Sequence, residues 1–375
     1  MMMKMLLLIT CWVTLMTALR AQELATSEGF AIPQPGREFV FPRDHGSHPE
    51  FKIEWWYVTG HLYAKTDGRR FGFQATWFRQ AVKHEGPESK LFQQGQMYLA
   101  HMALLDVKSG KFLHEERLNR GGWNAGASVE TLDVFNGNWF LRMEDAGEQR
   151  MGLRGTLGEE AGMELTMLPK KPLVFFGKDG VSRKAAAVSA ASHYLTFTRL
   201  GVEGVVEIGD EKVEVTGEAW MDHEISSSQL SPEQSGWDWA AIQLKDGREI
   251  MVYRLRLKSG GVDEHSTLAW IDQNGGVEHR KPDAYEWREV GHWVSQVTGA
   301  KYPIEVEVST IDPLSGQRVS YRLEPLMEAQ EQTGKLGGTA YWEGACRVFD
   351  AEGNEVGSAF LELAGYTGDL AKRFE

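Results

Sequence analysis

Short stretches in which hydrophobic and polar residues alternate run through most of this chain. Residues 71–77 (FGFQATW) and residues 251–257 (MVYRLRL) are two examples, with a large or apolar side chain at nearly every second position. Side chains two positions apart share one face of a β-strand, so these stretches predict strands with one buried face. Glycine-containing pairs such as Asn136-Gly137 and Asp246-Gly247 separate the stretches, as in tight hairpins. The pattern predicts an all-β fold of antiparallel strands.

The length of 375 residues favours two domains, because single hydrophobic cores rarely grow this large. A polar, proline-containing stretch at 226–234 (SSSQLSPEQ) interrupts the alternation and is typical of a linker. We therefore predict an N-terminal domain over 22–228 and a C-terminal domain over 229–375. One large sandwich with a long surface loop is the alternative.

Residues 1–21 have the pattern of a secretory signal, with Lys4 ahead of an apolar run from Met5 to Leu19. The run is short for a membrane span, although an uncleaved anchor stays an alternative. We expect a secreted or periplasmic protein with no stable membrane insertion after cleavage. Cleavage would leave Cys346 as the single cysteine, so the mature chain would have no internal disulfide.

The charge of the chain argues against nucleic acid as a partner. The formal net charge is −13, and it becomes −15 without residues 1–21, because Lys4 and Arg20 are lost and no acid is. An acidic chain with no basic run lacks the positive surface that binding to phosphate backbones requires.

Titratable and aromatic side chains crowd into residues 41–62 (FPRDHGSHPEFKIEWWYVTGHL). On a strand, Trp55 and Tyr57 face one side, and Glu54 and Trp56 face the other. A carboxyl group beside a ring has a raised pKa and can act as a general acid, and His45 can transfer protons near neutral pH. Turn capping and core packing are the structural alternatives for each of these residues.

A second crowded region follows about 170 residues later, with WMDHE at 220–224 and GWDW at 236–239. Two acids that flank a histidine can fix which ring nitrogen carries the proton and adjust the pKa of the imidazole as a base. Neighbouring strand positions point in alternate directions, so Asp222, His223 and Glu224 cannot all bind one ion without a bend in the strand. We predict no metal site, and a metal site is the minor alternative. The sequence has no GxSxG elbow, phosphate loop or dinucleotide fingerprint, and we predict no cofactor.

Several of these stretches resemble one known family. They are residues 41–62, FQATWFR (73–79), WMDHE (220–224), GWDWAAIQL (236–244), YWEGACRV (341–348) and LELAGY (361–366). Together they are similar to the AttH/carotenoid 1,2-hydratase-like (hydroxyneurosporene synthase-like) family. The resemblance implies two lipocalin-like antiparallel β-barrel domains packed together. Family members include hydratases that add water to a carotenoid alkene, secreted hydrolases, and accessory components of ABC export systems.

The resemblance implies acid/base chemistry, hydration or hydrolysis, on an apolar isoprenoid or lipid-like small molecule. The candidate catalytic residues are Asp222, His223, Asp238, Glu54 and His45. The candidate substrate-binding residues are Trp55, Trp56, Tyr57, Trp237, Trp239 and Tyr253. Carotenoid hydratases tend to carry an aromatic residue two places after the histidine, where this chain has Ile225, which argues against a carotenoid substrate. A non-catalytic binding protein that serves an ABC-type exporter is the alternative.

Overall fold

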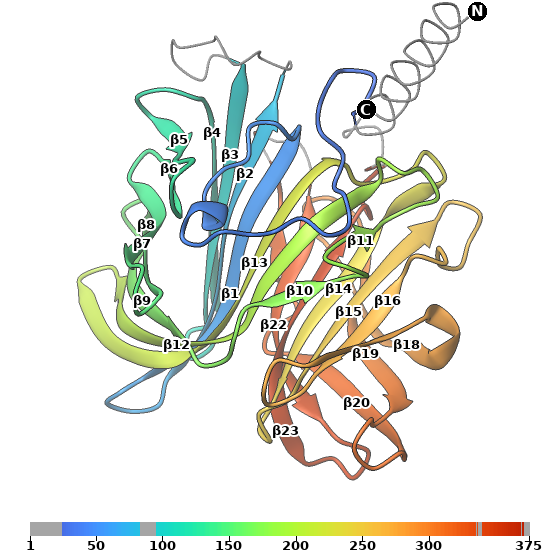
Figure 1. Cartoon of the computed structure of the whole chain (residues 1–375). Coiled ribbons are helices and arrows are strands. Elements are labelled where there is room, and N and C mark those ends of the chain that lie inside the picture. Colours follow the sequence, from blue (N-terminus) through green and yellow to red (C-terminus); the bar gives the residue numbers. More distant parts are fainter. Residues whose placement is uncertain (1–24, 83–94, 335, 337–339, 369, 371–375) are drawn as a thin grey trace, which may run out of the picture.

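The computed structural model describes residues 25–82, 95–334, 336, 340–368 and 370 (Figure 1). The predicted signal peptide at 1–21 lies outside the described residues. The described chain is all-β, with two antiparallel sheets and only two 3-10 turns, Arg43–His45 and Pro282–Ala284, so the all-β prediction is confirmed. Among the described residues, no helix has the length and apolar character needed to cross a membrane.

The first sheet contains every strand up to Ser228. Its strands are β1 (Ile53–Ala64), β2 (Arg70–Ala81), β3 (Gln96–Asp106), β4 (Lys111–Arg120), β5 (Ala125–Ala127), β6 (Asp133–Asn136), β7 (Trp139–Asp145), β8 (Arg150–Leu157), β9 (Ala161–Pro169), β10 (Val174–Phe176), β11 (Ser182–Arg183), β12 (Ala191–Ile208) and β13 (Glu211–Ser228). The order is β4-β3-β2-β1-β13-β12-β9-β8-β7-β6-β5, and β10 and β11 also pair with β12.

This sheet curls into a nearly closed barrel. Its two ends approach each other, because the amide of Asn136 in β6 donates hydrogen bonds to the carbonyls of Tyr98 in β3 and Arg117 in β4. The guanidinium of Arg117 lies 4.1 Å from the ring centroid of Trp139 in β7. The enclosed core contains Trp56, Trp77 and Trp139, all fully buried.

The second sheet contains every strand from Gln234 onward and forms a half-barrel. Its strands are β14 (Gln234–Leu244), β15 (Glu249–Leu257), β16 (Thr267–Ile271), β17 (Val277–Arg280), β18 (Tyr285–Val294), β19 (Lys301–Ile311), β20 (Arg318–Pro325), β21 (Glu331–Gln332), β22 (Tyr341–Phe349) and β23 (Glu355–Ala364). The order is β17-β16-β15-β14-β23-β22-β20-β19-β18, with β21 on β22. Whether the two sheets are separate folding domains stays a prediction.

The two sheets pack against each other (Figure 1) through a hydrophobic cluster separate from the core of the first barrel. It is built from β1, β12 and β13 on one side and β14, β15, β22 and β23 on the other. Their approach is close: a Cβ atom on Gly72 in β2 would lie 2.6 Å from the Cβ of Ala345 in β22. Glycine therefore suits position 72 because a larger residue would push the sheets apart. Hydrogen bonds also cross the contact, including His61 Nε2 to the carbonyl of Ala359 at 3.0 Å.

Candidate functional site

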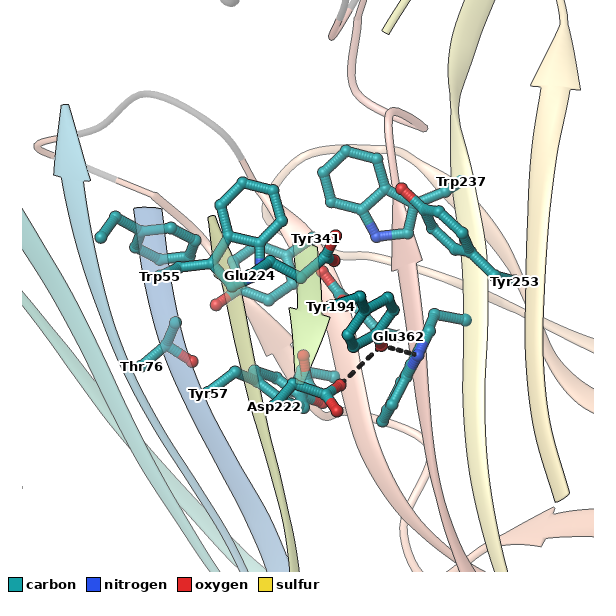
Figure 2. A pocket seen from close by; sticks show the side chains of 13 residues that line it. Trp55, Tyr57, Thr76, Tyr194, Asp222, Glu224, Trp237, Tyr253, Tyr341 and Glu362 are labelled. Atoms are coloured by element: carbon teal, nitrogen blue, oxygen red, sulfur yellow. Dashed lines mark hydrogen bonds between the residues drawn. The ribbon is translucent and has the colours of Figure 1, made fainter. Parts of the chain in front are cut away.

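A cavity of about 60 Å³ lies between the two sheets. Four carboxyl residues, eight aromatic residues and one threonine line it. The lining residues are Trp55, Tyr57, Thr76, Phe78, Tyr194, Asp222, Glu224, Trp237, Trp239, Tyr253, Tyr341, Glu343 and Glu362 (Figure 2). Pockets for drug-sized ligands usually measure roughly 300–1,000 Å³, so this cavity accepts a small ligand or the end of a longer one.

Strand register explains why residues far apart in the sequence meet here. One row of directly opposed neighbours crosses β2, β1, β13 and β12 as Thr76, Tyr57, Asp222 and Thr196. A second row crosses β15, β14, β23 and β22 as Tyr253, Trp239, Glu362 and Glu343. The first row belongs to one sheet and the second to the other, so packing of the sheets turns the two rows into opposite walls.

Asp222 is fixed in the first wall by three donors. The hydroxyl of Tyr194 donates to Oδ2 at 2.8 Å, the hydroxyl of Thr196 donates to Oδ1 at 2.6 Å, and the indole of Trp220 donates to Oδ1 at 2.7 Å. Burial raises the pKa of Asp222 to about 7, with nearby Glu224 adding to the rise, although the three donors favour the carboxylate. Asp222 therefore titrates near neutral pH.

Two further acids stand side by side in the second wall. Glu343 and Glu362 are direct cross-strand partners, where two negative charges would repel each other. Burial and the neighbouring Glu362 raise the pKa of Glu343 well above its usual range, and burial raises the pKa of Glu362 to about 8. The hydroxyl of Tyr57 donates to Glu343 Oε1 at 2.5 Å, whereas Oε2 is buried without a hydrogen-bond partner among the described residues.

A fully buried lysine completes the charged groups around the cavity. Lys184 Nζ lies 3.0 Å from Glu224 Oε2, and it lies 4.1 Å from the ring centroid of Tyr253 and 4.8 Å from that of Tyr194. Burial lowers the pKa of Lys184, although Glu224 opposes this shift. The ammonium is thus held by one carboxylate and two ring faces.

Five of the six predicted substrate-binding residues line the cavity: Trp55, Tyr57, Trp237, Trp239 and Tyr253. Tyr57 and Trp239 come from different sheets, and their rings meet edge to face at 5.3 Å. The indole of Trp239 donates to the Tyr194 hydroxyl at 3.0 Å, which continues the chain of hydrogen bonds to Asp222 (Figure 2). The sixth residue, Trp56, lies in the core of the first barrel.

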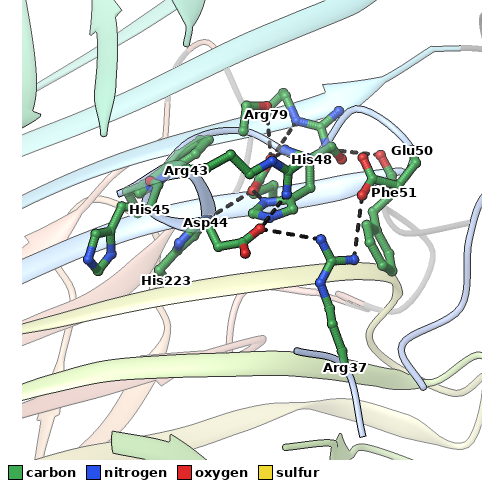
Figure 3. Close-up of polar contacts among 12 residues, drawn as sticks. Arg37, Arg43, Asp44, His45, His48, Glu50, Phe51, Arg79 and His223 are labelled. Carbon is green, nitrogen blue, oxygen red and sulfur yellow. Dashed lines mark hydrogen bonds and ion pairs between the residues drawn. The ribbon is translucent and has the colours of Figure 1, made fainter. Parts of the chain in front are cut away.

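Two predicted catalytic residues, Glu54 and His223, meet each other on the opposite face of the same sheet, away from the cavity. His223 Nε2 lies 2.9 Å from Glu54 Oε1, and Arg79 Nε donates to Glu54 Oε2 at 2.9 Å. His48 bridges Glu54 and Asp44, with both contacts at 2.8 Å (Figure 3). Although burial opposes ionisation, Arg79 and the two histidines hold the pKa of Glu54 well below its usual range.

The other two predicted catalytic residues also lie outside the cavity lining. His45 is buried beside the rings of Phe41 and Phe197, at centroid distances of 4.3 Å and 5.6 Å, and burial lowers its pKa to about 3. Asp238 is fully buried inside the second sheet, where it pairs with Arg254 at 2.6 Å and also with Arg256. Of the predicted acids, the structure brings only Asp222 to the cavity.

One trio of side chains has the donor atoms of a metal site. Single ligand atoms of His48, Glu54 and His223 lie within 4.8 Å of one another. Glu54 Oε1 is already the partner of both imidazole rings, and the Arg79 guanidinium places a positive charge against the same carboxylate. A metal ion would have to displace these contacts and would be repelled by Arg79, so the trio as arranged fits a hydrogen-bonded network better.

The sequence analysis missed Glu343, Glu362 and Lys184. The two acids stand in YWEGACRV and LELAGY, and their nearest neighbours on the same strand face are apolar or aromatic: Tyr341 and Ala345 for Glu343, and Phe360 and Ala364 for Glu362. An acid at a core-facing strand position is a usable signal, because it is rarely buried without a partner or a function. Lys184 lies between β11 and β12, where no pattern distinguishes it from a loop lysine.

Comparisons with known proteins agree with this architecture. An AttH candidate from Nitrosomonas europaea superposes with a TM-score of 0.79 at 33% identity, covering 90% of this chain and 100% of the other. Kievitone hydratase from Nectria haematococca superposes with a TM-score of 0.65 at 14% identity, covering 92% of this chain and 98% of the other. CghA superposes with a TM-score of 0.54 at 11% identity, with the same coverage of both chains. At such low identity the last two show the fold alone. No curated protein matches the chain.

The motifs that resembled one family in the sequence are therefore part of a match that spans most of the chain. Residues 32–366 match the family described as AttH-like, and this matched range includes the residues of both cavity walls. The predicted family is confirmed: this protein belongs to the AttH-like family.

Proposed function

We propose that this protein is an acid/base enzyme that hydrates an alkene of a small apolar molecule in the cavity between its sheets. The observation that carries the proposal is the pair of opposed acids in an aromatic cavity. Asp222 in one wall titrates near pH 7, and Glu343 in the other keeps its proton and has a buried oxygen without a partner. Two carboxyls with different pKa values provide the acid and base that hydration needs.

The chemistry would proceed in two steps. Glu343 donates its proton to one alkene carbon, which leaves a cation on the other carbon. A water molecule then attacks the cation, and the Asp222 carboxylate takes a proton from it, which gives an alcohol. The ring faces of Tyr57, Trp239 and Tyr253 would stabilise the cation through their negative quadrupole faces. The hydratase relative shows that this fold can support hydration, although its identity of 14% carries no residue roles.

Hydrolysis by a covalent route receives less support. The residues that line the cavity include no serine or cysteine. Within the described residues Cys346 is buried away from the cavity, and burial raises the pKa of its thiol far above the range in which a thiolate forms. Attack by water is therefore the route that these side chains favour.

The proposed substrate is an isoprenoid or lipid-like alkene whose end group enters the cavity. A secreted or periplasmic location and service to an ABC-type exporter stay part of the proposal, and both are compatible with a soluble carrier of apolar molecules. A protein that only binds such a molecule is the competing function, and the small cavity, which holds just one end of a long ligand, suits it as well.

The test is incubation of the purified protein with a panel of isoprenoid and lipid-like alkenes in ¹⁸O-labelled water, followed by mass spectrometry. Wild type should form an alcohol that carries the label. Glu343→Gln should slow this by about 10²- to 10⁴-fold, the usual contribution of a positioned acid. Glu352→Gln, which changes an exposed loop residue, is the matched control. Tight binding of panel members without any labelled product would favour the carrier.

A further inference from the structure

The cavity holds more acids than cations. Asp222, Glu224, Glu343 and Glu362 approach it from three strands, and Lys184 is the one cation placed against these lining residues in the described chain. Lys184 is paired with Glu224 alone, so three carboxyls have no cationic partner there. An acidic cluster can be a solvated surface, but Asp222, Glu224 and Glu343 are each more than nine-tenths buried, and Glu362 is partly buried in the wall of the same cavity.

A second, independent feature points to a ligand. Glu343 is 1% exposed, and its Oε2 has no hydrogen-bond partner within the described chain. A buried polar atom left without a partner costs free energy unless something binds it. The orphan oxygen is thus available to a donor or a positive charge inside the cavity.

The walls already bind a cation by their ring faces. The ammonium of Lys184 lies 4.1 Å from the centroid of Tyr253 and 4.8 Å from that of Tyr194, within the distance at which a ring face attracts a positive charge. Trp237, Trp239 and Trp55 add the ring type that attracts cations most strongly. Rings beside carboxyls recognise organic ammonium groups. Such groups are weakly hydrated, so they lose little solvation free energy when ring faces take the place of water.

We propose that this cavity is a receptor for a compact organic cation, such as a trimethylammonium group, held by the rings of Trp237, Trp239 and Tyr253 and by the Glu343 carboxyl. The cation would enter past Trp55 and Trp237, which are only partly buried. Its charge favours loss of the proton from the acids, because an opposite charge nearby lowers a carboxyl pKa. This ligand class goes beyond alkene hydration and does not depend on it.

The experiment compares choline with 3,3-dimethyl-1-butanol, which has the same shape but a carbon atom in place of the charged nitrogen. Both are titrated calorimetrically into wild-type protein. Choline should bind about tenfold more tightly than the neutral compound, the preference that ring faces and one carboxylate give a partly desolvated cation. Equal affinities, or no measurable binding of choline, would overturn the proposal.

Variants locate the site. Glu343→Gln and Trp237→Leu should each reduce choline affinity about tenfold, to that of the neutral compound, and leave the neutral compound unaffected. Glu352→Gln should change neither affinity, which controls for the general attraction of a chain of charge −13 to cations. Thermal melting of each variant establishes that it is folded, and Trp237, at the edge of the cavity, is the substitution that least disturbs the core. Choline binding that survives both variants would place the cation elsewhere and refute the proposal.

The outcome is separable from that of the hydration assay, because choline contains no alkene. Labelled alcohol formation together with no preference for choline would refute this inference and leave the proposed function intact. A clear preference for choline with no turnover of any alkene would do the reverse.

Discussion

The paired strands β1 and β13 carry buried acids on both faces, and the two faces treat them in opposite ways. On the face inside the first barrel, Glu54 is surrounded by donors from Ser47, His48, Arg79 and His223, and its pKa is held far below the usual range. On the face toward the second sheet, the pKa of Asp222 is raised to about 7. One residue along the strand, from 222 to 223, separates these two environments.

The difference lies in the charges nearby rather than in burial. Glu54 and Asp222 are both buried, yet Glu54 has a guanidinium in direct contact, whereas the direct donors to Asp222 are neutral and the acid Glu224 lies nearby. A carboxylate matched by cations stabilises the fold and has little freedom to exchange protons. An acid that burial leaves unmatched can change its protonation state near neutral pH, which is a property of functional sites. This contrast is the reason to assign a catalytic role to Asp222 and a structural role to Glu54.

Glu54→Gln provides the largest test of the contrast. It leaves Arg79 and His48 buried without their carboxylate, and breaking a buried ion pair in this way costs about 3–5 kcal/mol of unfolding free energy. Asp222→Asn removes no ion pair and should cost about 1 kcal/mol or less. Urea denaturation followed by tryptophan fluorescence measures both, with Glu352→Gln as the surface control. Equal losses for the two variants would show that both faces are structural.

The pH dependence of stability should have opposite signs on the two faces. The pKa of Asp222 rises from 3.8 in the unfolded chain to about 7, so the folded state binds the proton more tightly. Its stabilising contribution is complete below about pH 4 and is lost as the pH rises toward about 7, by at most about 1.4 kcal/mol per pH unit. The pKa of Glu54 is lowered, so its contribution is present above 4.5 and is lost on acidification.

Asp222→Asn isolates this effect. Stability of wild type minus that of the variant, measured by urea denaturation across the range from pH 4 to pH 8, should decline as the pH rises. Glu362 adds its own decline toward about pH 8, and because the Asp222 charge is one cause of its raised pKa, the variant should reduce that decline as well, which changes the difference in the same direction. A difference that is flat or increases with pH would mean that Asp222 is ionised in the folded protein, and the acid/base assignment would fail.

Local pattern predicted the strands and their faces but not which face meets the second sheet. Two-residue alternation separates Trp55 and Tyr57 from Glu54 and Trp56, and the structure has the same division, with the first pair at the cavity and Trp56 in the barrel core. Choosing the functional face depends on how β1 packs against β14, β22 and β23, which are about 180 or more residues away in the chain. No periodicity in residues 41–62 contains that information.

The same limit explains the acids. Glu343 and Glu362 become a pair only through the register of β22 on β23, and they oppose Asp222 only after the sheets pack. Asp238 and Asp222 look alike in sequence, each within two residues of a tryptophan, and only the three-dimensional positions of Arg254 and Arg256 show that Asp238 is matched by cations. The sequence therefore predicted which types of residue form the site, acids beside aromatic rings, better than which particular acids lie in it.

The smallest expected effect concerns Tyr194, which links the two sheets at the cavity by accepting from Trp239 and donating to Asp222. Tyr194→Phe removes both hydrogen bonds and should cost about 1 kcal/mol of unfolding free energy. Because the bond from Tyr194 favours the ionised form of Asp222, its loss should also raise the pKa of Asp222 further, which shifts the stability decline described above to higher pH.

The matched control is Tyr63→Phe, at a partly exposed ring outside the cavity. If the Tyr194 variant loses no more stability than the Tyr63 variant and the pH at which stability declines stays unchanged, Asp222 is not coupled to the second sheet. Its raised pKa would then come from burial in the first sheet alone, and the two faces of β13 would differ only in their cations.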